Sequence, residues 1–210
     1  MRNNLVRGLH RTCRHQDFSR MVGTTEARIA QLMQSASPNL TAPARKVVLG
    51  HGASGNAASM KPYVVGFKSR GIDAIAVDLP RGGAERAVPV FIKASGRGHE
   101  VIGGGQSFGG RVASMAAIEA DFGGLVLFSY PLHRPGFTDQ RRTEHLPSIR
   151  CPTLFLSGDR DPFARIDLLK ESVKLVPNSK LVIFKGQGHG LLAVLDEALD
   201  VAADFIRGLR

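Results

Sequence analysis

The stretch Val101–Ala120, VIGGGQSFGGRVASMAAIEA, reads as a short apolar strand, a sharp glycine-flanked turn and a helix. The turn, Gly105-Gln106-Ser107-Phe108-Gly109, has the G-x-S-x-G spacing of a nucleophile elbow. Such a turn exposes the serine hydroxyl, and the flanking glycines leave room for the tight backbone. The positive end of the following helix faces the place where an oxyanion would develop. Ser107 is therefore predicted to be a catalytic nucleophile.

Short apolar runs alternate with helical stretches from residue 44 onward. Runs such as LVLF, TLFL and LVIF are continuous, as in parallel strands that are covered on both faces. The predicted strands are Lys46–Leu49, Ile72–Val77, Glu100–Gly103, Leu125–Ser129, Thr153–Ser157 and Lys180–Phe184. The predicted helices are Lys61–Arg70, Phe108–Ala120, Ile166–Val176 and Leu191–Leu209. This order predicts an α/β fold with a mostly parallel sheet of about six strands and helices on both faces.

Two more polar groups follow later strands, at the sheet edge where ligands bind in such folds. His189 lies in the glycine-rich loop after the last strand, so it is predicted to be the general base. Asp161 is predicted to be the acid because it lies further along its loop, toward the histidine. Asp159 remains an alternative acid, and a helix-capping role for Asp161 remains open. The order serine, acid, histidine is the one that this motif requires.

The turn after the first strand has two interpretations. In the first, the backbone N–H groups of Ala53 and Phe108 form an oxyanion hole, with Ser54 as an alternative donor. In the second, the G-x-G-x-x-G spacing of residues 50–55 binds a dinucleotide, with Asp78 as the ribose-binding acid. Pro62 argues against the second interpretation, because it would fall inside the helix that a dinucleotide site requires.

The same edge holds candidates for the substrate pocket. His51, Gly52 and His133 are predicted to contact the substrate, and Arg134 follows His133 directly. Arg111 lies one helical turn after the predicted nucleophile and could pair with a nearby carboxylate. A structural or surface role for His133, Arg134 and Arg111 is equally compatible with the sequence.

The composition predicts a soluble globular protein without nucleic-acid or membrane partners. The chain has 210 residues, and none of its apolar runs approaches the roughly 18 residues of a membrane span. The net charge of +10 is partly concentrated in residues 1–20, and two Tyr with no Trp offer little stacking surface for bases. Two widely separated cysteines predict a reducing, cytoplasmic location, with neither a disulfide framework nor a metal site. No cofactor is expected, and the oligomeric state stays open.

The first 37 residues differ from the rest because they are rich in arginine and poor in acids. We expect residues 1–37 to be a flexible basic tail, with an organellar targeting segment or a misplaced start codon (Met21 as the true start) as alternatives. Residues 38–210 are expected to form a single domain, since a core of that size needs no disulfide or metal to be stable.

Several segments together resemble a branch of small α/β-hydrolases that is related to dienelactone hydrolase and includes the testis-expressed-30-like proteins. They are GGGQSFGGRVASM, FSYPLHRPG, RTEHL, TLFLSGDRDPF, GQGHG and HGASG, spread over roughly residues 44–192. The resemblance implies an α/β-hydrolase fold without a cap domain. It also implies a Ser107–Asp161–His189 triad that cleaves a small ester or thioester.

Two departures limit what the resemblance implies about the substrate. Dienelactone hydrolase itself uses a cysteine nucleophile, and Gln106 replaces the basic residue expected before the serine. Some members of the branch, among them a chromatin-complex subunit, act as interaction proteins. A non-catalytic interaction module is therefore the alternative to a hydrolase.

Overall fold

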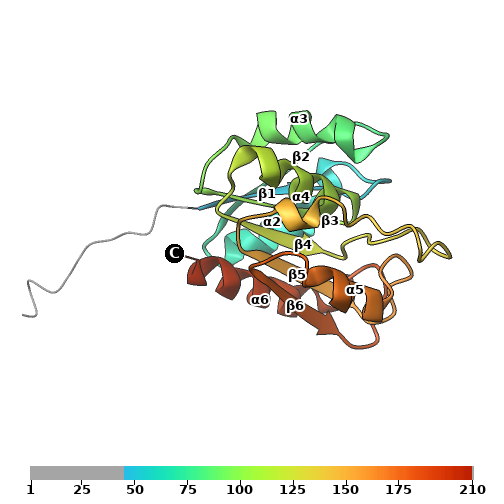
Figure 1. The fold of residues 1–210 in the computed structure, drawn as a ribbon. Helices are drawn as coiled ribbons and strands as arrows, with labels where there is room; N and C mark the ends of the chain where they lie inside the picture. The colour runs from blue at the N-terminus through green and yellow to red at the C-terminus, as the bar shows by residue number, and fades with distance from the viewer. Residues whose placement is uncertain (1–44, 210) are drawn as a thin grey trace, which may run out of the picture. The chain divides into compact units, whose positions relative to one another are not determined.

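The structure, a computed structural model, describes residues 45–209. The predicted tail, residues 1–37, lies outside the described residues, as do residues 38–44 and Arg210. The described chain forms one sheet of six parallel strands in the order β2-β1-β3-β4-β5-β6, with helices on both faces (Figure 1). The predicted fold class is thereby confirmed.

The elements follow the predicted alternation of strands and helices. The strands are β1 (Lys46–Gly50), β2 (Asp73–Val77), β3 (Val101–Gln106), β4 (Gly124–Phe128), β5 (Thr153–Gly158) and β6 (Ser179–Phe184). The α-helices are α2 (Lys61–Ser69), α3 (Ala84–Ser95), α4 (Phe108–Ala120), α5 (Ile166–Val173) and α6 (Leu195–Gly208). Short 3₁₀ helices are η1 (Ala57–Met60), η2 (Leu146–Ser148) and η3 (Leu192–Val194). The predicted elements are all present, and they differ from the observed ones only at their ends.

Helix α3 was not predicted from the sequence. Its buried side chains recur at three- and four-residue spacing, as on one face of a helix: Ala84, Ala87, Val88, Phe91, Ile92 and Ser95. Pro89 interrupts this pattern, because a proline in a helix interior removes a hydrogen bond and normally ends the helix. Here Pro89 lies on the exposed face, and the edge-to-face packing of Phe91 on Phe122 helps hold the helix on the sheet.

Each face of the sheet has its own apolar core. Helices α3, α4 and α5 cover one face, with Phe91 and Phe155 among the buried side chains. Helices α2 and α6 cover the other face, where Phe67 packs edge-to-face on Phe128. Burying one such side chain stabilises a fold by roughly 1.5–3 kcal/mol. Strand β4 is buried along its whole length, which explains why its sequence is continuously apolar.

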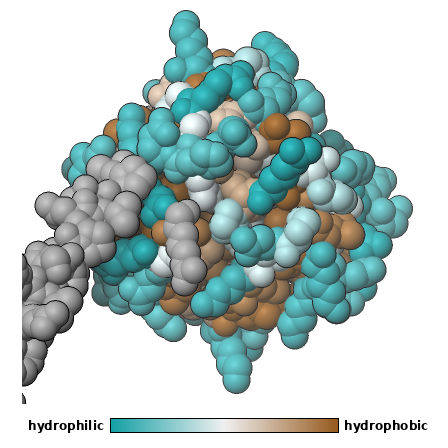
Figure 2. Space-filling model, turned by 60° about the vertical axis from the view of Figure 1, so that its left-hand side comes forward, coloured by the Kyte–Doolittle hydropathy of each residue, from teal (hydrophilic) through white to brown (hydrophobic). Residues whose placement is uncertain are grey.

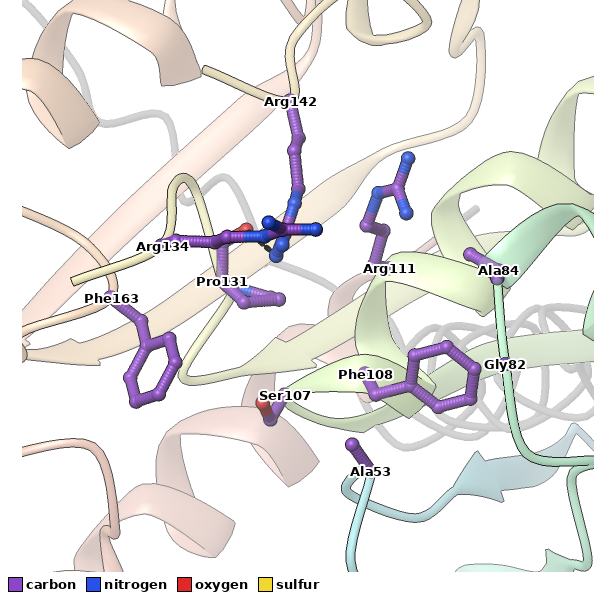
Figure 3. A pocket seen from close by; sticks show the side chains of 11 residues that line it. Ala53, Gly82, Ala84, Ser107, Phe108, Arg111, Pro131, Arg134, Arg142 and Phe163 are labelled. Atoms are coloured by element: carbon purple, nitrogen blue, oxygen red, sulfur yellow. Dashed lines mark hydrogen bonds between the residues drawn. The ribbon is translucent and has the colours of Figure 1, made fainter. Parts of the chain in front are cut away.

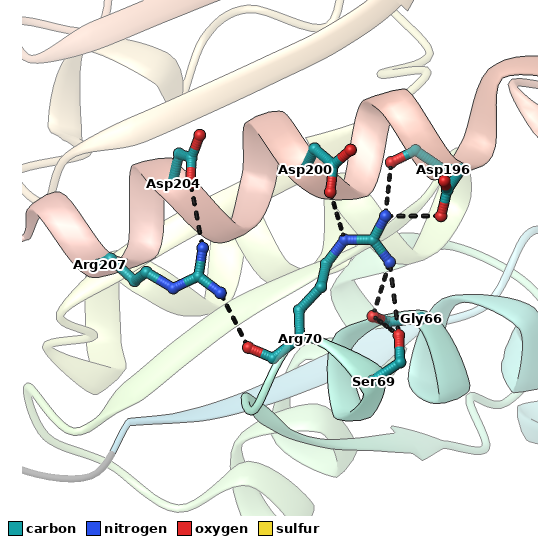
Figure 4. Close-up of polar contacts among 7 residues, drawn as sticks. All are labelled: Gly66, Ser69, Arg70, Asp196, Asp200, Asp204 and Arg207. Carbon is teal, nitrogen blue, oxygen red and sulfur yellow. Dashed lines mark hydrogen bonds and ion pairs between the residues drawn. The ribbon is translucent and has the colours of Figure 1, made fainter.

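A polar network at the surface ties α2 to α6 (Figure 4). The Arg70 guanidinium, at the end of α2, contacts Asp196 at 2.6 Å and Asp200 at 2.8 Å. Arg207 of α6 donates to the Arg70 carbonyl and pairs with Asp204 at 3.0 Å. Exposed ion pairs of this kind contribute up to about 1 kcal/mol each, so the network adds to the apolar contact rather than replacing it.

The surface is mixed in polarity. On the face in Figure 2, hydrophilic side chains project outward and hydrophobic residues lie between them. The large hydrophobic side chains that are exposed belong to different elements and loops: Val65, Val90, Ile118, Phe137, Leu175 and Leu192. Within residues 45–209, every helix is too short or too polar to cross a membrane.

Candidate active site

Ser107 lies at the sharp turn between β3 and α4, at the carboxyl edge of the sheet. Its backbone has φ 52° and ψ −115°, a conformation that costs free energy for any residue except glycine. The Ser107 N–H donates to the Phe128 carbonyl at 2.9 Å, and the Ser107 carbonyl accepts the Arg111 N–H at 3.1 Å. The strained residue is thus held on both sides by the fold.

Glycines let β1, β3 and α4 approach one another closely at this turn. Gly105 pairs with Gly50 of β1 and has φ 152°, which side-chain-bearing residues rarely adopt. A Cβ atom on either Gly105 or Gly109 would overlap the backbone of Gly50. A side chain at either position would therefore force α4 away from the sheet and displace Ser107.

His189 lies between Ser107 and Asp161. Its Nε2 is 2.7 Å from Ser107 Oγ, and its Nδ1 is 2.9 and 2.8 Å from the two carboxylate oxygens of Asp161. A carboxylate only accepts hydrogen bonds, so Nδ1 carries the proton and Nε2 accepts from the serine hydroxyl. The Asp161 side chain is fully buried, and it also accepts the Phe163 N–H at 2.8 Å. The three residues predicted as a triad thus form one hydrogen-bonded chain.

The two carboxylates of the β5 loop have different partners. Asp159 accepts the N–H of Gly186 at 2.7 Å and so holds the start of the loop that carries His189. Asp161 contacts the imidazole itself. The Phe163 ring packs against the His189 ring with centroids 4.3 Å apart, which restricts the orientation of the imidazole.

The two predicted oxyanion donors lie beside Ser107. Ala53 and Phe108 line the same pocket as the serine (Figure 3). Phe108 is the first residue of α4, so its N–H has no partner within the helix. In the described part of the chain, neither N–H donates to a backbone acceptor in a turn, loop or cap. Ser54, the alternative donor, lines a separate hollow with Gly52 and Gln106.

The dinucleotide interpretation of residues 50–55 does not fit the structure. That interpretation requires a helix that starts within the glycine turn, whereas residues 51–56 contain no helix. Helix α2 begins only at Lys61, and Pro62 lies in its first turn, where a proline is well tolerated.

His51 and His133 have structural partners in place of the predicted substrate contact. Both side chains are buried, and neither lines the pocket at Ser107. Gly52, which was also predicted to contact the substrate, does not line that pocket either. His51 Nδ1 donates to the Gly52 carbonyl, and its Nε2 accepts the Leu79 N–H at 2.9 Å. His133 repeats the arrangement, with its Nε2 accepting the Arg165 N–H at 3.0 Å. With both ring nitrogens engaged, these imidazoles do not fit the substrate-binding role predicted for them.

A pocket of about 460 Å³ opens at Ser107. Pro131 and Phe163 line it, and three arginine side chains lie together above Ser107 in Figure 3: Arg111, Arg134 and Arg142. Burial lowers the pKa of Arg142, and the positive charges of the other two arginines lower it further. Arg142 begins the RTEHL segment, but nothing in the sequence placed it in the pocket, since it lies in a long loop far from Ser107 along the chain.

His145 ends the loop that carries Arg134 and Arg142, and no role was predicted for it from the sequence. Its Nε2 is 2.8 Å from Ser114 Oγ and 3.4 Å from the Tyr130 hydroxyl. Burial, followed by the charge of Arg111, lowers the pKa of His145 to about 4. Burial raises the pKa of the Tyr130 hydroxyl to about 12. Both groups are therefore neutral near pH 7.

No group of three or more His, Cys, Asp or Glu side chains that could hold a metal ion occurs among residues 45–209. The chemistry available at the pocket is that of a hydroxyl, an imidazole and a carboxylate in hydrogen-bonded sequence, with two backbone N–H groups and three guanidinium groups around them.

Comparison with known proteins places the chain in a family. The model of the alpha/beta hydrolase domain matches residues 85–202, which is more than half of the chain. Human ABHD14B is 26% identical over 152 residues, covering 67% of this chain and 71% of that protein. The solved structure of the monoacylglycerol lipase of Paleococcus ferrophilus superposes with a TM-score of 0.66 at 15% identity, covering 79% of this chain and 95% of the lipase.

Other curated relatives are matched over a small part of their length. The non-heme chloroperoxidase of Burkholderia pyrrocinia is 38% identical over 65 residues, which is 30% of this chain and only 23% of the chloroperoxidase. The likeness to such proteins shows a shared segment and does not carry their activities.

Proposed function

Because this chain belongs to the α/β-hydrolase family, we propose that it is a serine hydrolase that cleaves a small ester or thioester through an acyl-enzyme. The observation that carries the proposal is the hydrogen-bonded chain from Ser107 Oγ through His189 to the buried Asp161 carboxylate. All three residues fall within the segment that the family model matches, residues 85–202.

In the first half of the proposed reaction, Ser107 Oγ attacks the carbonyl carbon while His189 Nε2 takes the hydroxyl proton. Asp161 stabilises the imidazolium that forms and keeps the proton of the neutral ring on Nδ1. The tetrahedral oxyanion accepts hydrogen bonds from the N–H groups of Ala53 and Phe108. Such donors typically contribute about 10²–10³ each to the rate of the chemical step.

In the second half, His189 gives the proton to the leaving alkoxide or thiolate, and the acyl group remains on Ser107. A water molecule then attacks the acyl-enzyme, with His189 taking its proton and returning it to Ser107 Oγ. The acid is released and the serine is restored. The reaction needs no residue beyond the triad and the oxyanion donors.

The pocket favours small substrates. Its volume of about 460 Å³ lies in the range of small-molecule sites. Within residues 45–209, the longest connection without a helix or strand is the loop of residues 129–145, which is too short to form a cap domain. We also propose that the chain belongs to the testis-expressed-30-like branch, on the strength of its SYPLHRPG and GDRDPF segments.

The test is turnover of p-nitrophenyl acetate by the full chain and by Ser107→Ala. We expect the wild type to release p-nitrophenol and the variant to lose several orders of magnitude in kcat. Asn56→Ala, a capping change in an exposed turn, serves as a control that keeps the triad. A folded wild type without turnover, or a fully active Ser107→Ala, would contradict the proposal and favour a non-catalytic interaction module.

A further inference from the structure

The pocket at Ser107 has a strongly basic wall. Arg111 comes from α4, while Arg134 and Arg142 come from the long loop after β4, so the sequence separates residues that the fold brings together. Figure 3 shows the three side chains converging on one side of the pocket, above Ser107. The same three arginines also line an adjoining hollow.

The positive charge of this wall is only partly compensated by the protein. Arg111 contacts Glu85 at 3.3 Å, but the Glu85 side chain is 65% exposed, so solvent screens the pair. Within residues 45–209, Arg134 and Arg142 form no ion pair, and the Arg142 guanidinium donates only to the Pro131 carbonyl, at 3.3 Å. Glu144 is the one carboxylate among the residues that line the adjoining hollow.

Arg141, the sequence neighbour of Arg142, has its charge compensated by Glu171 at 2.7 Å. Within the described chain, the three arginines of the wall lack so close a carboxylate partner. The Nε of Arg111 is buried and has no hydrogen-bond acceptor among the described residues. The repulsion among the three guanidinium groups and the unpaired Nε of Arg111 both destabilise the folded protein. No contact within residues 45–209 fully offsets them.

An anion bound against the wall would offset the repulsion among the three guanidinium groups. Guanidinium groups present several N–H donors in a planar fork that matches the oxygens of carboxylates, sulfates and phosphates. We propose that Arg111, Arg134 and Arg142 bind an anionic oxygen group of the substrate and so select charged esters over neutral ones. This inference rests on the proposed function, since Ser107 defines where the scissile carbonyl lies.

The test compares matched pairs of esters with the full-length protein. For the acyl side, the pair is the mono-p-nitrophenyl ester of glutaric acid and p-nitrophenyl pentanoate, which share chain length and leaving group. For the alcohol side, the pair is p-acetoxybenzoate and its methyl ester. We expect kcat/KM to favour the anionic member of at least one pair by tenfold or more. Added salt should reduce that preference, because part of the wall is exposed to solvent.

Substitutions then test whether the wall causes the preference. Arg142→Gln and Arg134→Gln should each lower the anionic-to-neutral ratio of kcat/KM by about tenfold, the usual effect of one charge-assisted hydrogen bond. Arg142→Lys should recover part of the ratio, since it keeps the charge without the planar fork. Arg165→Gln is the matched control: its guanidinium pairs with Asp167 and lines no part of the pocket, so the ratio should not change.

Competitive inhibition distinguishes the kind of anion. Stronger inhibition by inorganic phosphate than by glutarate indicates a phosphorylated substrate, and the reverse indicates a carboxylate. If neither inhibits, and the ratio is near one and insensitive to Arg142→Gln, the inference is wrong even though Ser107-dependent hydrolysis of the neutral esters stands. If no ester of either kind is hydrolysed, the proposed function itself has failed.

Discussion

His189 and the pair His51 and His133 sit on loops at the same edge of the sheet, yet their surroundings differ. Each ring of the pair donates to a backbone carbonyl and accepts a backbone N–H from a neighbouring loop. His189 instead bridges two side chains, the carboxylate of Asp161 and the hydroxyl of Ser107. The location of a histidine at the ligand-binding edge therefore does not determine its role.

The partners determine the role because they differ in what they can exchange. A backbone amide does not release or take a proton near neutral pH, so His51 and His133 act as fixed links between loops. His51 joins the turns after β1 and β2, and His133 joins the loops after β4 and β5. A hydroxyl and a carboxylate allow the His189 ring to accept a proton and then return it.

The largest expected effect is the loss of kcat in His189→Ala. Removing the proposed base should lower kcat for p-nitrophenyl acetate by roughly four to six orders of magnitude, because triad members act as a unit. The fold should survive, since the ring is partly exposed. His99→Ala is the control, because that side chain is 80% exposed. Equal activity of both variants would remove the distinction between His189 and the structural histidines.

The second largest effect is the loss of kcat when Asp161, the proposed acid of the triad, is replaced. Asp161→Asn keeps the size of the side chain but no longer holds the Nδ1 proton of His189, and comparable changes lower kcat by about 10⁴. Asp159→Asn should keep the hydrogen bond to the Gly186 N–H and remain within about tenfold of the wild type. Steady-state rates of the two variants decide between the carboxylates. A larger loss in Asp159→Asn would reverse the assignment.

A smaller effect, on stability rather than chemistry, is expected for His133→Ala. The change removes the partner of the Arg165 N–H in a part-buried hydrogen bond, which typically costs about 0.5–1.5 kcal/mol. Urea denaturation should show the loss, while the kcat of the folded variant stays far above that of His189→Ala. A variant of unchanged stability and greatly reduced kcat would mean that His133 belongs to the chemistry after all.

The smallest effect at neutral pH is the contribution of His145 to stability, which changes as the pH falls. Burial lowers its folded-state pKa to about 4 from 6.5, so the unfolded chain binds the proton first as the pH falls. The stability that His145 contributes is present above pH 6.5 and is lost as the pH falls toward 4. Between pH 7 and pH 5, the wild type should lose about 1–2 kcal/mol of unfolding free energy that His145→Gln does not lose. Parallel urea titrations at both pH values would show whether the two curves instead fall together.

Much of the fold follows from local patterns in the sequence. The continuous apolar runs mark the strands because both faces of this sheet are covered, and the glycines of the elbow mark the place where three elements meet. Helix α3 was not predicted because Pro89 lies inside it and a proline normally ends a helix. Packing of its apolar face on the protein core stabilises the helix despite the proline. The helix-breaking tendency of Pro89 is outweighed by the six side chains of α3 that are buried in the folded protein.

The site was less predictable than the fold because it depends on distant residues. Motifs singled out Ser107, Asp161 and His189, and the structure brings these three into hydrogen-bond contact. His51 and His133 were also predicted to contact the substrate, because the N–H groups of Leu79 and Arg165 that engage their rings lie far away in the sequence. No pocket role was predicted for Arg142, since its place beside Arg111 and Arg134 depends on neighbours in space rather than in sequence.

Labelling with a fluorophosphonate tests the identity of the nucleophile most directly. The reagent bonds covalently to a serine only where a base activates its hydroxyl, and mass spectrometry of the digested protein locates the adduct. We expect a single phosphonyl group on the peptide that contains Ser107, and almost none in His189→Ala. A folded wild type that stays unlabelled, or that carries the adduct on another serine, would contradict the assignment of Ser107.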